Sequence, residues 1–200
     1  MKKAFIVILF LPLCAIAQDS QRFITKGLFA GKGTLAAGQM TAFKATNMYI
    51  SGNLEYYLED NISFRGGLYI FLGSSGSKHP LSKNSTCFTG FYYHFKTNNH
   101  LDPYIGLEPG ISWTQLKSPD KPPTETYPYN ISSYPQSISP VASITAGINF
   151  FATKWTHLFI EAKYLHGVLV SDIPAIPLNE FRFAFGFGFN INTLKRRSPQ

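Results

Sequence analysis

The sequence FRFAFGFGFNI, at residues 181–191, alternates between two kinds of side chain along its whole length. Large apolar residues occupy every odd position from Phe181 to Ile191, whereas the even positions hold arginine, alanine, glycine or asparagine. Successive side chains of a β-strand point to opposite faces. A period of two therefore predicts a strand with one bulky apolar face and one small or polar face.

The same alternation recurs upstream, in segments of ten to thirteen residues separated by turn-rich intervals. With the terminal stretch these segments predict eight strands, of which the first, at residues 26–37, has its faces blurred by glycine and alanine. The connections alternate strictly between short (59–61, 97–101, 152–155) and long (38–46, 73–85, 116–139, 169–179). An antiparallel up-and-down meander with both termini on one side gives three short turns and four long loops.

Composition excludes several classes of protein. Charged residues make up 14% of the chain, against about 25% in ordinary soluble domains. Aromatic residues make up 16%, which is too many for a disordered chain. Two cysteines cannot build a disulfide scaffold. After residue 17, no apolar run reaches the roughly 18 to 20 residues that a membrane-spanning helix needs. The basic residues are scattered, so the formal net charge of +7 predicts no nucleic-acid partner.

The size of the apolar faces indicates which way they point. Eight rows of bulky side chains cannot all fit inside an eight-stranded barrel, whose interior is only wide enough to be filled by side chains. Pointed outward, they would contact hydrocarbon, and closure of the sheet would satisfy every backbone hydrogen bond there. The sequence therefore predicts an all-β fold, an eight-stranded antiparallel up-and-down transmembrane β-barrel. A secreted soluble barrel with an apolar ligand inside is the alternative.

The first seventeen residues have the organisation of a signal peptide. Lys2 and Lys3 form a basic start, residues 4–13 an apolar stretch, and residues 15–17 supply small side chains at the cleavage site. We expect a signal peptide at 1–17, a lead-in at 18–25, the barrel at 26–192 and a short tail at 193–200.

The face opposite the bulky one carries charges that the barrel would enclose. An unpaired ion is costly to bury, so we expect these side chains to pair with one another and to plug the lumen; a selectivity filter in a narrow channel is the alternative. The set comprises Glu55, Arg65, Glu108, Glu161, Lys163 and Arg182. Aromatic residues near the strand ends predict two interfacial girdles, with Tyr57 and Phe151 in one and Phe88 in the other.

On residues 49–61, 103–106 and 147–154 and on its terminal strand, the sequence resembles the small outer-membrane β-barrel proteins of the OmpX/OmpA transmembrane-domain type, in particular stand-alone porin-family barrels. The resemblance covers nearly the whole chain after residue 17. It implies an outer-membrane location, short turns and termini in the periplasm, and long loops outside. It also implies that the barrel-assembly machinery reads Gly186, Phe189 and Ile191, although Ile191 is not aromatic and a tail follows the strand.

The resemblance favours a non-enzymatic protein with a structural or adhesion-type role. We expect a monomer in contact with outer-membrane lipid and lipopolysaccharide, and an unknown external ligand at the loop tyrosines Tyr127, Tyr129 and Tyr134. We expect no cofactor, because the histidines lack metal-ligand spacing. A lipid A-modifying hydrolase is a further alternative, but His166 has Gly167 and Val168 after it, where such enzymes place a serine two positions from the histidine.

Overall fold

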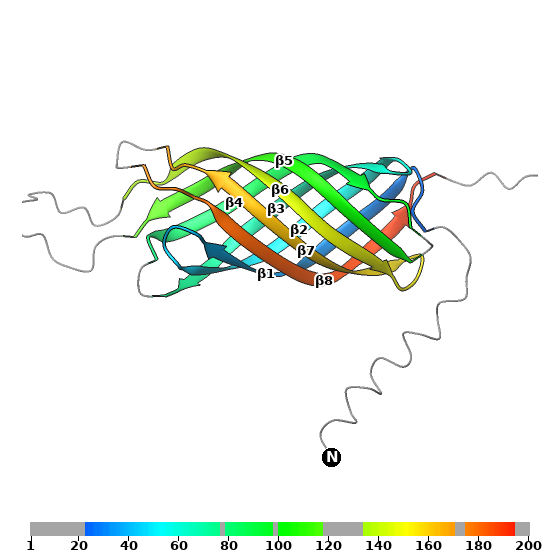
Figure 1. Cartoon of the computed structure of the whole chain (residues 1–200), viewed down its shortest axis with the longest axis horizontal. Helices are drawn as coiled ribbons and strands as arrows, with labels where there is room; N and C mark the ends of the chain where they lie inside the picture. Colours follow the sequence, from blue (N-terminus) through cyan, green and yellow to red (C-terminus); the bar gives the residue numbers. More distant parts are fainter. Residues whose placement is uncertain (1–22, 77–78, 98–99, 118–133, 171–174, 195–200) are drawn as a thin grey trace, which may run out of the picture.

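The computed structural model describes residues 23–76, 79–97, 100–117, 134–170 and 175–194, and its eight strands close into one barrel (Figure 1). Each strand pairs antiparallel with the next, and the first strand pairs with the last. The predicted eight-stranded antiparallel up-and-down barrel is therefore confirmed. In chain order the strands are β1 (Leu28–Met40), β2 (Thr46–Glu59), β3 (Ile62–Ser75), β4 (Leu81–His94), β5 (Leu101–Leu116), β6 (Ser137–Phe151), β7 (Thr156–Gly167) and β8 (Glu180–Asn192).

The bulky side chains of β8 point away from the barrel. Phe183, Phe185 and Phe187 are 60%, 73% and 67% exposed. By contrast, Arg182 and Glu161 are 1% and 3% exposed and lie inside. A soluble barrel would need the opposite arrangement, so this alternative is wrong. The outer surface is that of a barrel surrounded by hydrocarbon. Among the described residues, no helix is long and apolar enough to cross a bilayer.

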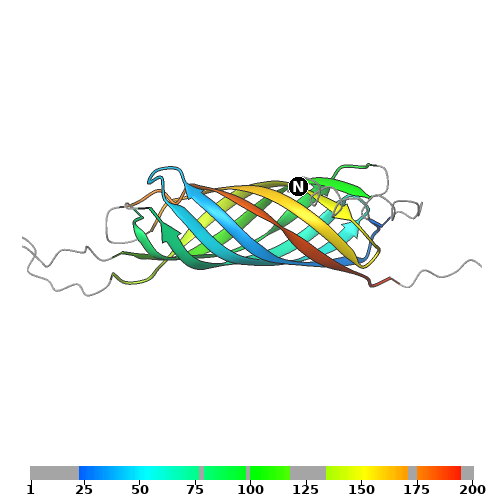
Figure 2. The ribbon, with the colours of Figure 1, turned by 90° about the horizontal axis from the view of Figure 1, so that it is seen from below.

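The two ends of the barrel differ in their connections. The turn end carries residues 60–61, 95–100 and 152–155, together with the start of β1 and the end of β8, and the loop end carries the other four connections. Figures 1 and 2 show an elongated barrel whose strands run obliquely from one end to the other.

Two of the long loops are shorter than the sequence predicted. The connections expected at 38–46 and 73–85 reduce to 41–45 and 76–80. The strands continue into them because their backbones still have partners there: Gln39 pairs with Thr46, and Thr46 also pairs with Ser75. Backbone pairing does not need the apolar alternation that marks the membrane-crossing part of each strand, so the sequence pattern ends before the strand does.

Part of the predicted aromatic girdles is wrong. Tyr57, Phe88 and Phe151 are each 1% exposed and point into the barrel. Neighbouring residues of a strand face opposite sides, so the pairs at 56–57 and 150–151 must each place one ring inside. Outward-facing aromatic residues do occur at the turn end, namely Tyr56, Phe95, Trp155 and Phe189.

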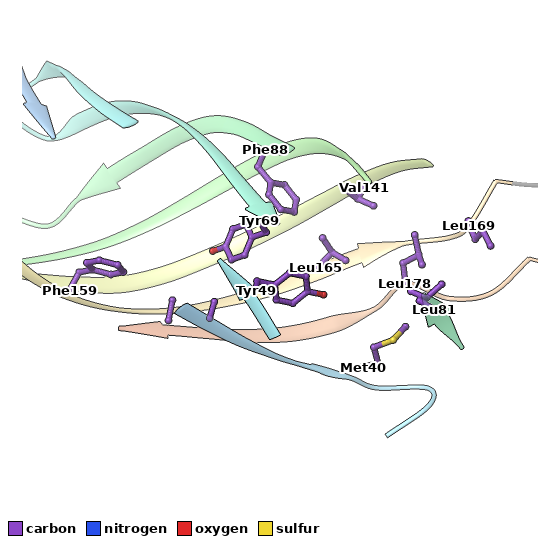
Figure 3. Packing of buried hydrophobic residues seen from close by; sticks show 12 residues of the cluster. Met40, Tyr49, Tyr69, Leu81, Phe88, Val141, Phe159, Leu165, Leu169 and Leu178 are labelled. Carbon is purple, nitrogen blue, oxygen red and sulfur yellow. The ribbon is translucent and has the colours of Figure 1, made fainter. Parts of the chain in front are cut away.

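Two buried apolar clusters lie inside the barrel. At the loop end, five aliphatic side chains form what we call the loop-end cap (Figure 3): Met40, Leu81, Leu165, Leu169 and Leu178. At the turn end, Leu28, Tyr57 and Phe151 pack together with Phe23 and Ile24 from the segment before β1. The charged interior lies between the loop-end cap and the turn-end cluster, and other members of the larger apolar cluster, such as Phe88 and Phe159, contact its cations.

Candidate functional site: the charged interior

Nine charged side chains of the described residues are buried in the interior, each at most 5% exposed. They include all six residues that the sequence predicted for the lumen, and they add Lys32, Asp102 and Glu180. Ions buried this deeply require partners, because transfer from water costs several kcal/mol for each.

Arg65 is the centre of the first group. Its Nη2 donates to Glu55 Oε2 at 2.9 Å. Glu55 lies directly opposite Arg65 on the neighbouring strand β2. Arg65 Nη1 donates to Glu161 Oε2 at 2.6 Å, across the interior to β7. The guanidinium also lies over the ring of Tyr92, 3.7 Å from its centroid, and 4.6 Å from that of Tyr104. Arg65 thus links two walls of the barrel and fills the space between them.

Lys163 and Glu108 form the second group. Lys163 Nζ donates to Glu108 Oε2, and the same oxygen accepts from Thr145 Oγ1 at 2.7 Å. Ser143 adds a hydrogen bond of 3.1 Å to it. Lys163 Nζ lies 4.4 Å from the centroid of the Phe88 ring. A ring that the sequence assigned to the lipid interface therefore contacts a buried cation instead.

The third group contains a residue that the sequence reasoning missed. Arg182 Nε donates to Glu180 Oε2 at 2.9 Å, and Arg182 Nη1 donates to Thr86 Oγ1 at 2.6 Å. Glu180 also accepts from Tyr49 and from Asn47, at 2.9 and 2.8 Å. Glu180 has the same parity as Arg182, so extending the alternation of β8 by one step would have found it.

Lys32 was missed for a different reason. It lies on the glycine- and alanine-rich first strand, whose faces the sequence could not distinguish. Its Nζ is 3.2 Å from Glu55 Oε2 and 4.7 Å from the centroid of the Tyr104 ring. Glu55 therefore has both Arg65 and Lys32 as cationic partners.

The turn-end side of the interior brings together Ser63, His94 and Asp102. His94 Nδ1 is 2.8 Å from Asp102 Oδ1, and His94 Nε2 is 2.8 Å from Ser63 Oγ. These contacts have the order of a nucleophile, a base and an acid.

The hydrogen bonding of Ser63 opposes a nucleophilic role. Ser63 Oγ donates its single proton to Glu55 Oε1 at 2.6 Å, so it accepts from His94. That is the reverse of the proton transfer that an attacking serine needs. Ser63, His94 and Asp102 are also each at most 2% exposed.

The remaining predicted residues lie apart from this interior group. Phe189 and Ile191 point outward from β8, whereas Gly186 faces Thr34 inside. The backbone carbonyl of Tyr134 accepts from Gln115 Nε2 at 2.8 Å. His166 lies on the outer face, paired with Ala142. In the described part of the chain, no three His, Cys, Asp or Glu side chains are placed to hold a metal ion.

Several predictions fall outside the described residues. These are Tyr127 and Tyr129, the signal peptide at 1–17, the first part of the lead-in at 18–22 and most of the tail at 195–200.

A hollow of about 860 Å³ lies on the outer surface. Its floor consists of Gly31, Gly33, Gly52 and Gly66, and its walls include Leu54, Leu68, Phe187 and Phe189. A Cβ added at Gly33 or Gly66 would meet nothing within 4 Å. The glycines belong to the lipid-facing side of the sheet, so this hollow is not an opening of the lumen.

Comparison with known proteins finds similarity in structure. No family model and no curated protein sequence matches the chain. The N-terminal β-barrel domain of Pseudomonas aeruginosa OprF aligns at a TM-score of 0.55 and 16% identity, over 83% of this chain and 98% of that chain. The outer membrane protein OprG of the same species aligns at 0.55 and 14%, over 86% and 100%. Ail, the attachment invasion locus protein of Yersinia pestis, aligns at 0.52 and 12%, over 84% and 100%.

These neighbours and the outward apolar surface define the class. The chain has the fold of the small outer-membrane β-barrel proteins, so the resemblance to barrels of the OmpX/OmpA type is confirmed at the level of fold. The outer-membrane location expected from the sequence agrees with these neighbours.

Proposed function

We propose that this protein is a non-enzymatic outer-membrane barrel that is closed by its own side chains and acts through its loop end as a surface-interaction, adhesion-type protein. The observation that carries the proposal is the hydrogen bond of Arg65 to both Glu55 and Glu161, which ties β3 to β2 and β7 across the lumen. Eight strands leave little free bore even without such a network.

The loop end is where this barrel would meet other molecules. Its longest connection, residues 117–136, includes Tyr127, Tyr129 and Tyr134. Tyrosine is enriched at protein interfaces because its ring offers a large contact area and a polar tip. One structural neighbour is described as an attachment invasion locus protein, which supports an adhesion-type role.

An adherence experiment tests the proposal. Bacteria that display the barrel are compared with bacteria that display a variant in which residues 118–133 are replaced by a glycine–serine segment of equal length. We expect the wild type to increase adherence to cultured epithelial cells and the variant to return to the level of the empty vector. Heat-modifiable migration on a gel verifies that both barrels are folded. Equal adherence of the two strains would contradict the proposal.

Two further measurements address the alternatives. In planar lipid bilayers we expect no steady conductance from the wild type, and a reproducible single-channel current would favour a narrow channel. We also expect the lipid A mass spectrum of the host cells to be the same with the wild type, Ser63→Ala and His166→Ala. A lipid A species that appears only with the wild type would favour a hydrolase.

The expected partners also belong to this proposal. The apolar belt of a folded barrel lies in outer-membrane lipid, and contact with lipopolysaccharide is proposed for its outer leaflet side. Recognition of Gly186, Phe189 and Ile191 by the barrel-assembly machinery and the monomeric state remain predictions from the sequence.

A further inference from the structure

His94 is a buried histidine whose two ring nitrogens both face oxygen atoms. It is the last residue of β4 and is 2% exposed. Its Nδ1 is 2.8 Å from Asp102 Oδ1 and 3.0 Å from Asp102 Oδ2. Its Nε2 is 2.8 Å from Ser63 Oγ and 3.2 Å from Glu55 Oε1. A neutral imidazole has one donor and one acceptor nitrogen, whereas an imidazolium has two donors. The charge of the ring therefore follows from whether these oxygens donate or accept.

Asp102 requires a proton on Nδ1. Its Oδ2 accepts from the Tyr57 hydroxyl at 2.9 Å and from Asn149 Nδ2 at 2.8 Å. Hydrogen bonds that are donated to a carboxylate favour its ionised form. An ionised carboxylate can only accept, so Nδ1 of His94 is the donor in the contact with Asp102.

Ser63 and Glu55 require a second proton, on Nε2. Glu55 accepts from Arg65 Nη2 at 2.9 Å and lies 3.2 Å from Lys32 Nζ, so its carboxylate is ionised as well. The Ser63 hydroxyl has a single proton, which it donates to Glu55 Oε1 at 2.6 Å. Both oxygens that face Nε2 are therefore acceptors. His94 has a proton on each nitrogen and a positive charge.

The charge balance of the interior agrees with an imidazolium. The nine charged side chains buried in the described part of the barrel are four cations and five carboxylates, and a cationic His94 makes the two numbers equal. Compensation matters here because a buried charge without a partner is costly. The cations are Lys32, Arg65, Lys163 and Arg182, and the carboxylates are Glu55, Asp102, Glu108, Glu161 and Glu180.

A second buried histidine has different surroundings. His157 on β7 is 1% exposed, so it is as deeply buried as His94. Its side-chain hydrogen bond is with the uncharged Asn190, and the charge of the nearby Lys32 repels a further proton on its ring. Burial also disfavours a charged ring. His157 is therefore the matched neutral histidine of this interior.

We infer that His94 is an imidazolium at neutral pH and that its second proton fastens the turn-end parts of β2, β3, β4 and β5 to one another. Its donors reach Asp102 on β5, Ser63 on β3 and Glu55 on β2. Without the second proton, an acceptor nitrogen would face an acceptor oxygen, and the interior would keep an uncompensated negative charge. This proton-dependent clasp goes beyond the proposed function, which requires only that the lumen be closed.

The groups around the ring leave His94 as the one that changes charge in this cluster between about pH 6.5 and 9. Ordinary carboxylates are ionised above about pH 5, and tyrosine, lysine and arginine keep their protons to about pH 10. The rings of Tyr57 and Tyr104 lie 4.6 and 5.7 Å from that of His94, between centroids. The other charged groups of the cluster are Glu55 on β2, Arg65 on β3, Asp102 on β5 and Lys32 on β1.

Nitrogen-15 magnetic resonance of the histidine rings in the folded barrel tests the charge directly. At about pH 7.5 an ordinary histidine is mostly neutral. We expect His94 to have a proton on both ring nitrogens at this pH and His157 to have one on a single nitrogen. Assignment through the backbone identifies each ring without a variant. A single protonated nitrogen on His94 would overturn the inference.

The pH dependence of unfolding in urea tests the clasp. Folded His94 keeps a proton that the unfolded chain releases near about pH 6.5, so stability falls as the pH rises above that value. Relative to His94→Gln, we expect the unfolding equilibrium constant of the wild type to rise by up to about tenfold per pH unit between about pH 6.5 and 9. His157→Gln, which removes a neutral ring, should keep the wild-type profile.

Parallel profiles of the wild type and His94→Gln would show that the second proton does not stabilise the barrel, and would overturn the clasp. If His94→Gln does not fold, the ring spectrum of the wild type decides. The adherence experiment changes only residues 118–133, so failure of the adhesion-type role and failure of the clasp are separate results.

Discussion

Arg65 on β3 donates a hydrogen bond of 2.6 Å to Glu161 on β7, a residue 96 positions away on a strand that is not its neighbour. Tyr104 on β5 donates to the same oxygen of Glu161 at 2.9 Å. Side chains from three non-adjacent strands therefore meet at one carboxylate. The barrel wall is held by backbone pairing between neighbours, and its opposite sides are held by these charged contacts.

Arg65→Met tests the contribution of this centre. Removing one partner of a buried ion pair typically costs about 3–5 kcal/mol, because the remaining charges lose their compensation. We expect the free energy of unfolding to fall by that amount in urea titrations in phospholipid vesicles, followed by tryptophan fluorescence.

Lys26→Met is the control for this prediction. Lys26 Nζ lies 2.7 Å from Glu59 Oε1, but both side chains are more than half exposed. Solvent screens such a pair, so we expect a loss below about 1 kcal/mol. If both variants lost the same free energy of unfolding, the burial of Arg65 would contribute nothing to the stability of the barrel.

Most of this fold can be predicted from the sequence, because residues that face lipid must be apolar and residues that face the narrow interior must be small or polar, and the two kinds alternate along each strand. In β8 the alternation holds at every position from Phe181 to Ile191, so the sequence predicts both the strand and which of its faces points outward. In β1 the alternation between apolar and polar residues is weak. There the glycine-rich outer face left Lys32 unassigned, although it pairs with Glu55 inside.

The contacts between interior residues depend on how the barrel closes. Alternation places Glu161 and Arg65 on the inner face but does not say that they meet across it. Asp102 was overlooked because it follows a turn, and Phe88 was misassigned because an aromatic ring is compatible with either face. The contact between Arg65 and Glu161 depends on the register between strands, which the sequence does not show, whereas extending the alternation of β4 and β5 by two residues would have placed Phe88 and Asp102 inside.

Tyr56 and Tyr57 offer the same substitution on opposite faces of β2. The hydroxyl of Tyr57 donates to Asp102 Oδ2 at 2.9 Å in the buried interior, whereas Tyr56 points outward. A hydrogen bond to a charged group contributes about 1.5–3 kcal/mol, so Tyr57→Phe should lower the free energy of unfolding by that amount. Tyr56→Phe should change it by less than about 0.5 kcal/mol. The reverse order in urea titrations would contradict the orientation of β2.

Two glycines are expected to respond differently to one added methyl group. A Cβ on Gly90 would lie 2.0 Å from the backbone carbonyl oxygen of Leu107, so β4 and β5 would have to separate. We expect Gly90→Ala to cost about 1–3 kcal/mol or more and to reduce the folded, heat-modifiable band on a gel. Gly66→Ala, which adds the methyl group to open space on the outer face, should fold like the wild type. Equal folding yields would mean that β4 and β5 do not approach this closely.

Phe185 provides the most direct test of the environment around the barrel. Its side chain is 73% exposed, it lies near the middle of β8, and it pairs with Ile160, which also points outward. In a bilayer, a lysine on this face at mid-depth should cost about 2–4 kcal/mol, because its ammonium cannot reach water easily. We therefore expect Phe185→Lys to lower the free energy of unfolding in phospholipid vesicles by that amount. Phe185→Leu, which removes the ring but keeps an apolar side chain, should have a much smaller effect. If Phe185→Lys were as stable as Phe185→Leu, water rather than hydrocarbon would surround this face of β8.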